Sequence, residues 1–232
     1  MIGRGLIIPT RNTLRNNLLL RWGFEEGSSN TLHDTSGHGF NGTLYGSPAW
    51  ELSGSRPGVT FNGSSQYASS ALGTLLSGLQ TVTCCLLASG LTNTGTRIIV
   101  EYGTDWGANA GTFGAYTDSG TIETGVRGNV GHNYRSNSTS FDTGLHLFCF
   151  VFDYTQGDGV SETSMYIDGV VSGYSSQSTT GNNTGTFDTN KSLYLAARAG
   201  TSLWLSLSIY EFRVYSGLLP IDAMKAIRWG KG

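Results

Sequence analysis

The sequence has no long hydrophobic run and few charged residues. No apolar stretch approaches the roughly 20 residues that a membrane-spanning helix needs, so we expect a soluble protein with no membrane partner. The apolar run at residues 6–9 is too short for the hydrophobic region of a secretory signal peptide, so we expect no cleaved leader. Charged residues make up only 13% of the 232 positions, whereas glycine occurs 34 times. This balance is typical of short strands joined by tight turns.

The three cysteines of the chain all lie within apolar segments. Cys84 and Cys85 are adjacent, so in a strand their side chains point to opposite faces and make a poor metal pair. No spacing typical of zinc ligands occurs, and Cys149 lies in the apolar run "LHLFCFVFDY". The sequence therefore predicts three buried free thiols and assembly in a reducing cytoplasm.

Motifs for hydrolytic chemistry are also missing. Glycosidases built on a β-sandwich place two carboxylates on alternate residues of a strand, in the pattern E-x-D-x-x-E, which this sequence lacks. The nearest candidates are Glu101 and Asp105, but a turn expected at Gly103 separates them. No H-E-x-x-H motif occurs, and no histidine stands in a recognisable motif with a serine or cysteine nucleophile. We expect a protein that is not an enzyme and has no catalytic residues.

Strand-like segments recur along the chain with turn residues between them. The segment 145–154 is apolar on both faces, which predicts a strand in the middle of its sheet. Asn62 with Gly63, and Asp168 with Gly169, predict two tight hairpins. Further strands are expected at residues 18–24, 81–88, 97–102, 112–116, 121–127 and 131–135.

The C-terminal region predicts one irregular strand and one helix. Apolar residues alternate up to Ile209 and then shift phase, which indicates a β-bulge near Tyr210. A short C-terminal helix is expected to begin at Pro220. Together these patterns predict an all-β, two-sheet antiparallel jelly-roll sandwich at residues 18–232, preceded by an extended N-terminal arm at residues 1–17.

Five segments carry a resemblance to a known family. They are "LRWGFEEGSSNTLHDTSGHGFNGTLYG", "GVTFNGSSQYAS", "LHLFCFVFDY", "MYIDGVV" and "SIYEFRVYSGLLPIDAMKAI". In this order, over roughly residues 18–228, the chain resembles concanavalin A-like domains of the laminin-G type. The resemblance implies two antiparallel sheets, one of them concave, with rim loops that bind sugars or proteins in many members. It implies no activity, because lectins, enzymes and structural modules share this fold.

The resemblance also suggests one metal site, since many relatives carry a structural calcium ion held by the early loop and the final strand. Glu25, Asp34 and Glu211 roughly match those positions, although Glu211 stands where the family commonly has Asp. Calcium requires about six to eight oxygen ligands, and three carboxylates are an incomplete set. The alternative is that these acids cap turns. No other cofactor is expected.

A saccharide site would require aromatic rings beside polar groups. Trp106, Tyr116 and Tyr134 lie in loop-rich sequence, and Arg127 lies in the same region. Aromatic faces stack on pyranose rings, while arginine binds hydroxyl groups. These four residues are therefore the candidates for glycan binding. The alternative is that the aromatic side chains pack in the core.

Charge is distributed unevenly along the chain. Residues 1–21 contain four arginines and no acid, and the last eight residues contain three basic residues, so the body between them is acidic. An acidic body repels phosphate groups, which argues against nucleic acid as a partner. The basic ends remain able to contact an acidic protein surface.

The N-terminal arm combines cationic side chains with an apolar anchor, and in this it resembles the arms of bacteriophage virion proteins. We expect a capsid decoration, cement or accessory protein of the virion, assembled in the host cytoplasm. Its partners would be the major capsid protein or another virion protein, and further copies of the chain in a homo-oligomer such as a trimer. The docking candidates are Arg4, Leu6, Ile7, Ile8, Pro9, Arg11 and Arg15.

Two alternatives to this hypothesis stay open. The arm could fold back onto its own sandwich as an additional edge strand, since sheet edges need cover. In function, the chain could be a lectin-like carbohydrate-binding module of a secreted or surface protein, or a tail or receptor-binding protein.

Overall fold

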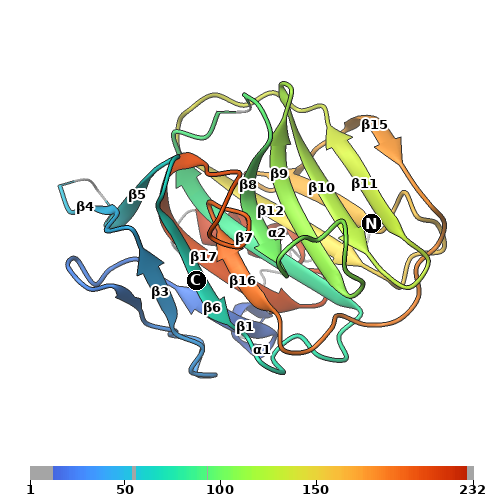
Figure 1. Ribbon diagram of the computed structural model, residues 1–232, viewed down its shortest axis with the longest axis horizontal. Coiled ribbons are helices and arrows are strands. Elements are labelled where there is room, and N and C mark those ends of the chain that lie inside the picture. Colours follow the sequence, from blue (N-terminus) through green and yellow to red (C-terminus); the bar gives the residue numbers. More distant parts are fainter. Residues whose placement is uncertain (1–12, 54–55, 93, 229–232) are drawn as a thin grey trace, which may run out of the picture.

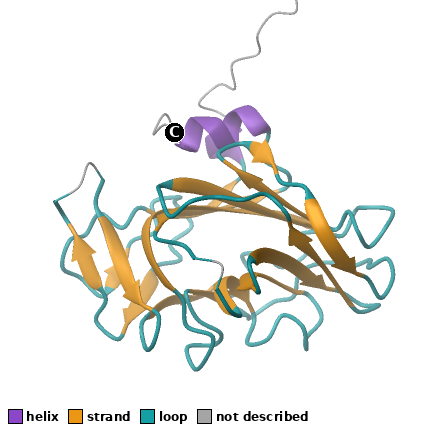
Figure 2. Cartoon of the chain, turned by 90° about the horizontal axis from the view of Figure 1, so that it is seen from above, coloured by secondary structure: helices purple, strands orange, loops and turns teal. Residues whose placement is uncertain are grey.

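A computed structural model describes residues 13–53, 56–92 and 94–228 of the chain. This part of the chain forms two antiparallel β-sheets packed face to face, with two short helices on the outer side of one sheet (Figures 1 and 2). The predicted all-β sandwich with a short C-terminal helix is confirmed. No helix among the described residues is long and apolar enough to cross a membrane.

The sheet that carries the helices on its outer side is termed sheet A. Its strands are β1 (Leu18–Trp22), β4 (Ala49–Glu51), β5 (Gly58–Asn62), β7 (Thr81–Ser89), β12 (His146–Asp153), β13 (Thr163–Ile167), β14 (Val170–Val171) and β17 (Ser206–Ser216). In the described part of the chain they follow the order β14-β13-β12-β7-β17-β5-β4, and β1 pairs with the second half of β17.

The opposite sheet is termed sheet B. Its strands are β2 (Thr31–Leu32), β3 (Gly42–Tyr45), β6 (Tyr67–Ala71), β8 (Arg97–Tyr102), β9 (Thr112–Asp118), β10 (Thr121–Arg127), β11 (His132–Asn137), β15 (Tyr174–Ser178) and β16 (Ser192–Leu195). Among the described residues they follow the order β15-β11-β10-β9-β8-β16-β6-β3-β2. Figure 1 shows β8 to β11 side by side in the half of this sheet that carries the candidate site.

Two apolar cores stabilise the sandwich, one on each side of sheet A. Phe148, Phe150 and Phe152 of β12 point into the main core between the sheets. Leu147 and Val151 point outward into a second core, which the helices α1 (Thr13–Asn16) and α2 (Ile221–Arg228) cover. The prediction that β12 is buried on both faces is therefore confirmed. Burying each such side chain contributes about 1.5–3 kcal/mol.

Helix α2 begins where the sequence predicts it. Pro220 precedes its first residue, and the Pro220 carbonyl accepts from the backbone N–H groups of Ala223 and Met224, at 2.9 and 3.0 Å. Ala223, Met224 and Ile227 share the buried face, which packs on the outer side of sheet A. A proline is favourable at this point because the first turn of a helix has no internal acceptor for its N–H groups.

The predicted hairpin at Asn62 and Gly63 is wrong. Strand β5 belongs to sheet A and pairs with β17, whereas β6 belongs to sheet B and pairs with β16, so the segment crosses from one sheet to the other. The turn itself forms as expected, because the Asn62 side-chain carbonyl accepts from the N–H groups of Ser64 and Ser65. The Asn-Gly pair therefore determines the bend. The pairing of the two flanking strands is determined by β17 and β16, which are distant in sequence.

Two other local predictions are confirmed. Strands β13 and β14 form a hairpin at Asp168 and Gly169, whose φ angles of 52° and 76° are those of a tight primed turn. The register between β17 and β7 shifts between Ile209 and Glu211, which is the predicted bulge near Tyr210. After this shift, the acidic side chain of Glu211 and the basic side chain of Arg213 lie on the outer face of sheet A.

The prediction of three free thiols is wrong. All three cysteines are buried, but Cys85 and Cys149 form a disulfide, and Cys84 alone has a free thiol among the described residues. Cys85 of β7 lies directly opposite Cys149 of β12, with their Cα atoms 4.2 Å apart. The register of the two strands creates this pairing, and it removes the reason for expecting a reducing compartment.

Most of the proposed docking arm lies outside the described residues. This applies to the candidates Arg4, Leu6, Ile7, Ile8, Pro9 and Arg11. Arg15 is exposed on α1, and Leu14 beside it packs into the second core, so the sandwich includes residues that the sequence analysis assigned to the arm. Virion docking, a capsid partner and a homo-oligomer stay predictions.

Candidate functional site

Trp106 forms the floor of a hollow on the outer face of sheet B. It lies in the loop between β8 and β9, and its indole covers Gly114 of β9 and Gly125 of β10, which are paired across the two strands. A Cβ atom at either glycine would overlap the indole. Because both positions lack a side chain, the ring lies flat on the sheet and Trp106 is only 5% exposed.

Two hydrogen bonds hold the Trp106 backbone in this position. Its N–H donates to Oε1 of Glu101 at 3.1 Å, and its carbonyl accepts from the Thr112 hydroxyl at 2.9 Å. The partners come from β8 and β9, which flank the loop. The sheet therefore fixes both the backbone and the ring of Trp106.

Further aromatic rings surround Trp106. Tyr116 of β9 stacks beside it, with ring centroids 5.7 Å apart and planes inclined by 28°. His132 of β11 presents an edge to the indole at 6.4 Å, and Tyr134 stacks on His132 at 6.2 Å. These rings bound a hollow of about 400 Å³, within the range of small-molecule sites. Its lining comprises Thr96, Asp105, Trp106, Gly107, Tyr116, Asp118, Glu123, His132, Tyr134 and Arg198.

Polar groups enter the hollow between the rings. The Glu123 carboxylate of β10 accepts from the hydroxyl groups of Tyr116 and Ser136, its neighbours on β9 and β11. Burial and the bond to Glu123 raise the pKa of Tyr116, so this phenol stays protonated. Arg198, in the loop after β16, pairs with Asp105 at 3.5 Å. The hollow thus offers three carboxylates, a guanidinium group and phenol groups to a polar ligand.

Glu101 lies beneath this surface and is fully buried. Its Oε1 accepts from Nε of Arg198 at 3.1 Å, while among the described residues its Oε2 has no hydrogen-bond partner. Burial raises the pKa of Glu101 to about 7, although the charge of Arg198 and the Trp106 N–H oppose the rise. Glu101 and Asp105, the nearest approach to a catalytic pair in the sequence, are therefore both bound to one arginine.

Three of the four glycan candidates meet in this hollow. Trp106, Tyr116 and Tyr134 line it, whereas Arg127 lies at its edge and donates from Nη1 to the Gly107 carbonyl at 2.7 Å. The alternative of packing in the core fits Trp106 in part, because most of its surface is covered by sheet B.

The sequence analysis missed five polar or aromatic residues of the hollow, namely Thr96, Asp118, Glu123, His132 and Arg198. Glu123 alternates with Gly125 and Arg127 on β10, and this two-residue period could have identified it as an outward-facing residue. His132 stands two residues before Tyr134 on β11, so the two-residue period places both side chains on the same face of the strand. Arg198 had no such signal, because its loop reaches the hollow only through the pairing of β16 with β8.

A second aromatic cluster lies on the same face of sheet B. Tyr45 of β3 and Tyr67 of β6 are direct cross-strand partners, and their rings stack at 4.4 Å with planes 4° apart. The rings of Tyr194 and Trp204 lie beside that of Tyr67, with centroids 6.3 and 5.7 Å from its centroid. Tyr194 lies opposite Glu101 across β16 and β8, so the cluster adjoins the hollow. The sequence analysis assigned no role to these residues.

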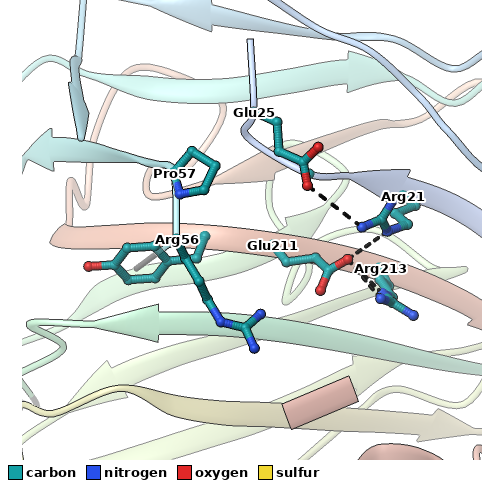
Figure 3. A pocket seen from close by; sticks show the side chains of 8 residues that line it. Arg21, Glu25, Arg56, Pro57, Glu211 and Arg213 are labelled. Carbon is teal, nitrogen blue, oxygen red and sulfur yellow. Dashed lines mark hydrogen bonds and ion pairs between the residues drawn. The ribbon is translucent and has the colours of Figure 1, made fainter. Parts of the chain in front are cut away.

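The calcium candidates do not fit a calcium site. Figure 3 shows Glu211 between Arg21 and Arg213, and its Oε1 accepts from Nε of Arg21 at 2.6 Å and pairs with Nη2 of Arg213 at 2.8 Å. The Glu25 side chain is 67% exposed and lies 4.0 Å from Arg21. A cation would be repelled by these guanidinium groups. Among the described residues no three His, Cys, Asp or Glu side chains could hold a metal ion.

The third candidate, Asp34, caps a turn. Its Oδ1 accepts from the N–H groups of Arg21 and Ser36, and its Oδ2 accepts from that of Phe40. Burial opposes the charged form, but these hydrogen bonds lower the pKa of Asp34 overall. Its oxygens thus bind the loop between β2 and β3 and fix it to Arg21 of β1, as the turn-capping alternative predicts.

Many solved structures are similar to the chain in fold, and three of them illustrate the range. Domain 4 of AbnA, a GH43 extracellular arabinanase from Geobacillus stearothermophilus, in complex with arabinotriose, aligns with a TM-score of 0.62 and 17% identity over 91% of this chain and 98% of that chain. The botulinum neurotoxin serotype G binding domain aligns with a TM-score of 0.68 and 11% identity, over 93% and 51%. The serotype D ligand binding domain, in complex with N-acetylneuraminic acid, aligns with a TM-score of 0.66 and 14% identity, over 94% and 53%.

These likenesses differ in how much of each neighbouring chain they cover. The chain spans about half the length of the two neurotoxin structures, but nearly all of the arabinanase domain. No protein-family profile matches the chain, and no curated protein sequence is detectably similar to it. At such low identities the likeness establishes the sandwich fold, and this fold is found in binding domains that accompany other domains.

Proposed function

We propose that this chain is a non-catalytic carbohydrate-binding module, with its saccharide site in the hollow over Trp106. The observation that supports this most is the gathering of aromatic rings and unlike charges in one hollow on sheet B. Saccharides require this mixture, because their ring faces carry apolar C–H groups while their edges carry hydroxyl groups. A pocket with a few convergent polar groups among aromatic rings is a typical ligand site.

The geometry suggests how each group would bind a sugar. The rings of Tyr134 and Tyr116 offer faces and edges for stacking, and Glu123 and Asp105 offer carboxylate oxygens to hydroxyl donors. Arg198 offers N–H donors to hydroxyl or ring oxygens. Trp106 is held by sheet B before any ligand arrives, so little conformational entropy is lost at this residue on binding.

The neighbouring structures support a saccharide ligand. The arabinanase domain was solved with arabinotriose, and it matches the present chain over almost its whole length. One neurotoxin domain was solved with N-acetylneuraminic acid. Arabinotriose is therefore the first neutral oligosaccharide to test, followed by a panel of other plant, bacterial and animal glycans.

Binding without hydrolysis is supported by the surroundings of Glu101 and Asp105, the nearest approach to a catalytic pair in the sequence. Glu101 is buried and does not line the hollow, and Arg198 pairs with both Glu101 and Asp105. A glycosidase needs two carboxyl groups free to reach opposite sides of one glycosidic bond. Acids held by one guanidinium group serve better to position Trp106 and Arg198 than to transfer protons.

Affinity electrophoresis and calorimetry with this panel test the proposal. We expect at least one saccharide to bind, and Tyr134→Ala to weaken binding about ten-fold, the loss typical of an aromatic residue central to an interface. Tyr174→Ala is the matched control, because Tyr174 is 49% exposed on the neighbouring strand β15 and does not line the hollow. Equal binding by the two variants, or no binding by any saccharide, would contradict the proposal.

A further inference from the structure

Four arginines gather on the outer side of sheet A, on the sheet opposite the proposed saccharide site. Arg15 comes from α1, Arg21 from β1, Arg56 from the segment before β5, and Arg213 from β17. They line two adjoining hollows of about 190 and 360 Å³, which share Arg21 and Arg213 as wall residues. Figure 3 shows side chains that line the smaller hollow, with Arg21 and Arg213 beside Glu211 and with Arg56 unpaired among the residues drawn.

Positive charge exceeds negative charge in the described linings of the two hollows. The four arginines face two acids, Glu25 and Glu211. Glu211 is shared, because its Oε1 accepts from Arg21 at 2.6 Å and from Nε of Arg213 at 3.0 Å. Glu25 is largely exposed and 4.0 Å from Arg21, so solvent screens it. Asp34 lies near Arg21 but outside both linings, with its oxygens directed to loop N–H groups.

Two of the four arginines, Arg21 and Arg213, are held in place before any ligand binds. The Arg213 side chain is 4% exposed, and its Nη1 donates to the Tyr215 hydroxyl at 3.2 Å. Nη1 of Arg21 donates to the Thr35 hydroxyl at 3.1 Å. Arg56 has no ion-pair partner within the described residues, although it lines the smaller hollow. Because the four arginines face only the two carboxylates of Glu25 and Glu211, a further anion in the hollow would be stabilised.

From this arrangement we infer that the hollow bounded by Arg21, Arg56 and Arg213 binds an oxyanion, namely a sulfate, phosphate or carboxylate group. Guanidinium groups present paired N–H donors that match the oxygens of such groups. The adjoining larger hollow, lined also by Thr35 and Ser36, has room for the molecule that carries the anion. The site is independent of the proposed saccharide hollow, since the two lie on different sheets.

An NMR titration of the full chain tests this inference. ¹⁵N-labelled protein is titrated with sodium sulfate, sodium phosphate, sodium glucuronate and glucose 6-sulfate at constant ionic strength, with sodium chloride as reference. We expect saturable shifts of signals from β1 and β17. Tighter binding of the two sugar anions than of the inorganic ions would identify an acidic saccharide as the source of the oxyanion, and the reverse would identify a free ion.

Two charge-matched variants decide whether the arginines form the site. Arg56→Gln should weaken anion binding about five-fold, the effect of losing one partly exposed ion pair. Arg97→Gln removes the same charge from an exposed position on sheet B and should change nothing. Thermal unfolding shows whether each variant is folded, and neither should alter saccharide binding at Trp106. Equal effects of the two variants, or no shift beyond the chloride reference, would overturn the inference.

Discussion

The six-membered ring of Trp106 lies so close to Gly125 that a Cβ atom on this glycine would overlap three of the ring carbons. The ring therefore rests on bare backbone, and a second glycine, Gly114, supports the rest of the indole. Glycine is usually unfavourable inside a strand because it adds no packing surface. Here the missing side chains create the seat for an aromatic residue.

Replacing these glycines should displace Trp106. We expect Gly125→Ala to destabilise the fold by about 1–3 kcal/mol, as overpacking does, and to remove saccharide binding. Tryptophan fluorescence, denaturant unfolding and affinity electrophoresis check these outcomes. The matched control is Gly157→Ala, since nothing lies within 4 Å of a Cβ atom there. Unchanged binding in Gly125→Ala would mean that Trp106 does not form the floor of the site.

Glu101 should make stability depend on pH. Burial raises its pKa from 4.5 to about 7, so the folded chain holds this proton over a range in which the unfolded chain has lost it. The free energy of unfolding should therefore fall as pH rises from about 4.5 to about 7 and then level off. Glu101→Gln should lack this fall. Urea unfolding of both proteins between pH 4 and 8 measures the difference, and parallel curves would exclude a raised pKa.

His146 should contribute a second pH dependence of the same sign. Partial burial disfavours its charged form, but hydrogen bonds to Asp168 at 2.8 Å and Asp142 at 3.0 Å outweigh burial and raise the pKa above 6.5. A raised folded pKa stabilises the chain fully below pH 6.5, and this contribution is lost as pH rises through the folded value.

The variant His146→Gln isolates this effect. Its melting temperature should lie below that of the wild type at pH 5.5 and approach it at pH 9. His33→Gln changes an exposed histidine and serves as the control. If the wild type and His146→Gln differ by the same amount at both pH values, the charge of His146 does not stabilise the fold.

Reduction of the disulfide between Cys85 and Cys149 should weaken the sandwich. The bond closes a segment of 64 residues, and a cross-link of this kind contributes about 2–4 kcal/mol by restricting the unfolded chain. Denaturant unfolding with and without dithiothreitol measures the loss. Alkylation of unfolded, unreduced protein should modify one thiol, that of Cys84, and three after reduction. Three modified thiols before reduction would show that the bond does not form.

Local sequence patterns determined several elements of the fold. Alternation and composition predicted β12 with both faces buried, the bulge near Tyr210 and the helix at Pro220, because each pattern is set by residues within a few positions. Aromatic residues in loop-rich sequence identified three members of the hollow for the same reason. These features depend on which residues are neighbours along the chain.

Contacts between distant segments were decided by the tertiary structure alone. The strands flanking Asn62 pair in different sheets, Cys85 meets Cys149 across 64 residues, and Arg198 reaches the hollow through the register of β16. The physical reason is that strand order and register minimise the free energy of the whole sandwich. A periodicity of two residues reveals which side chains face the core, but it does not specify the strand that lies beside them.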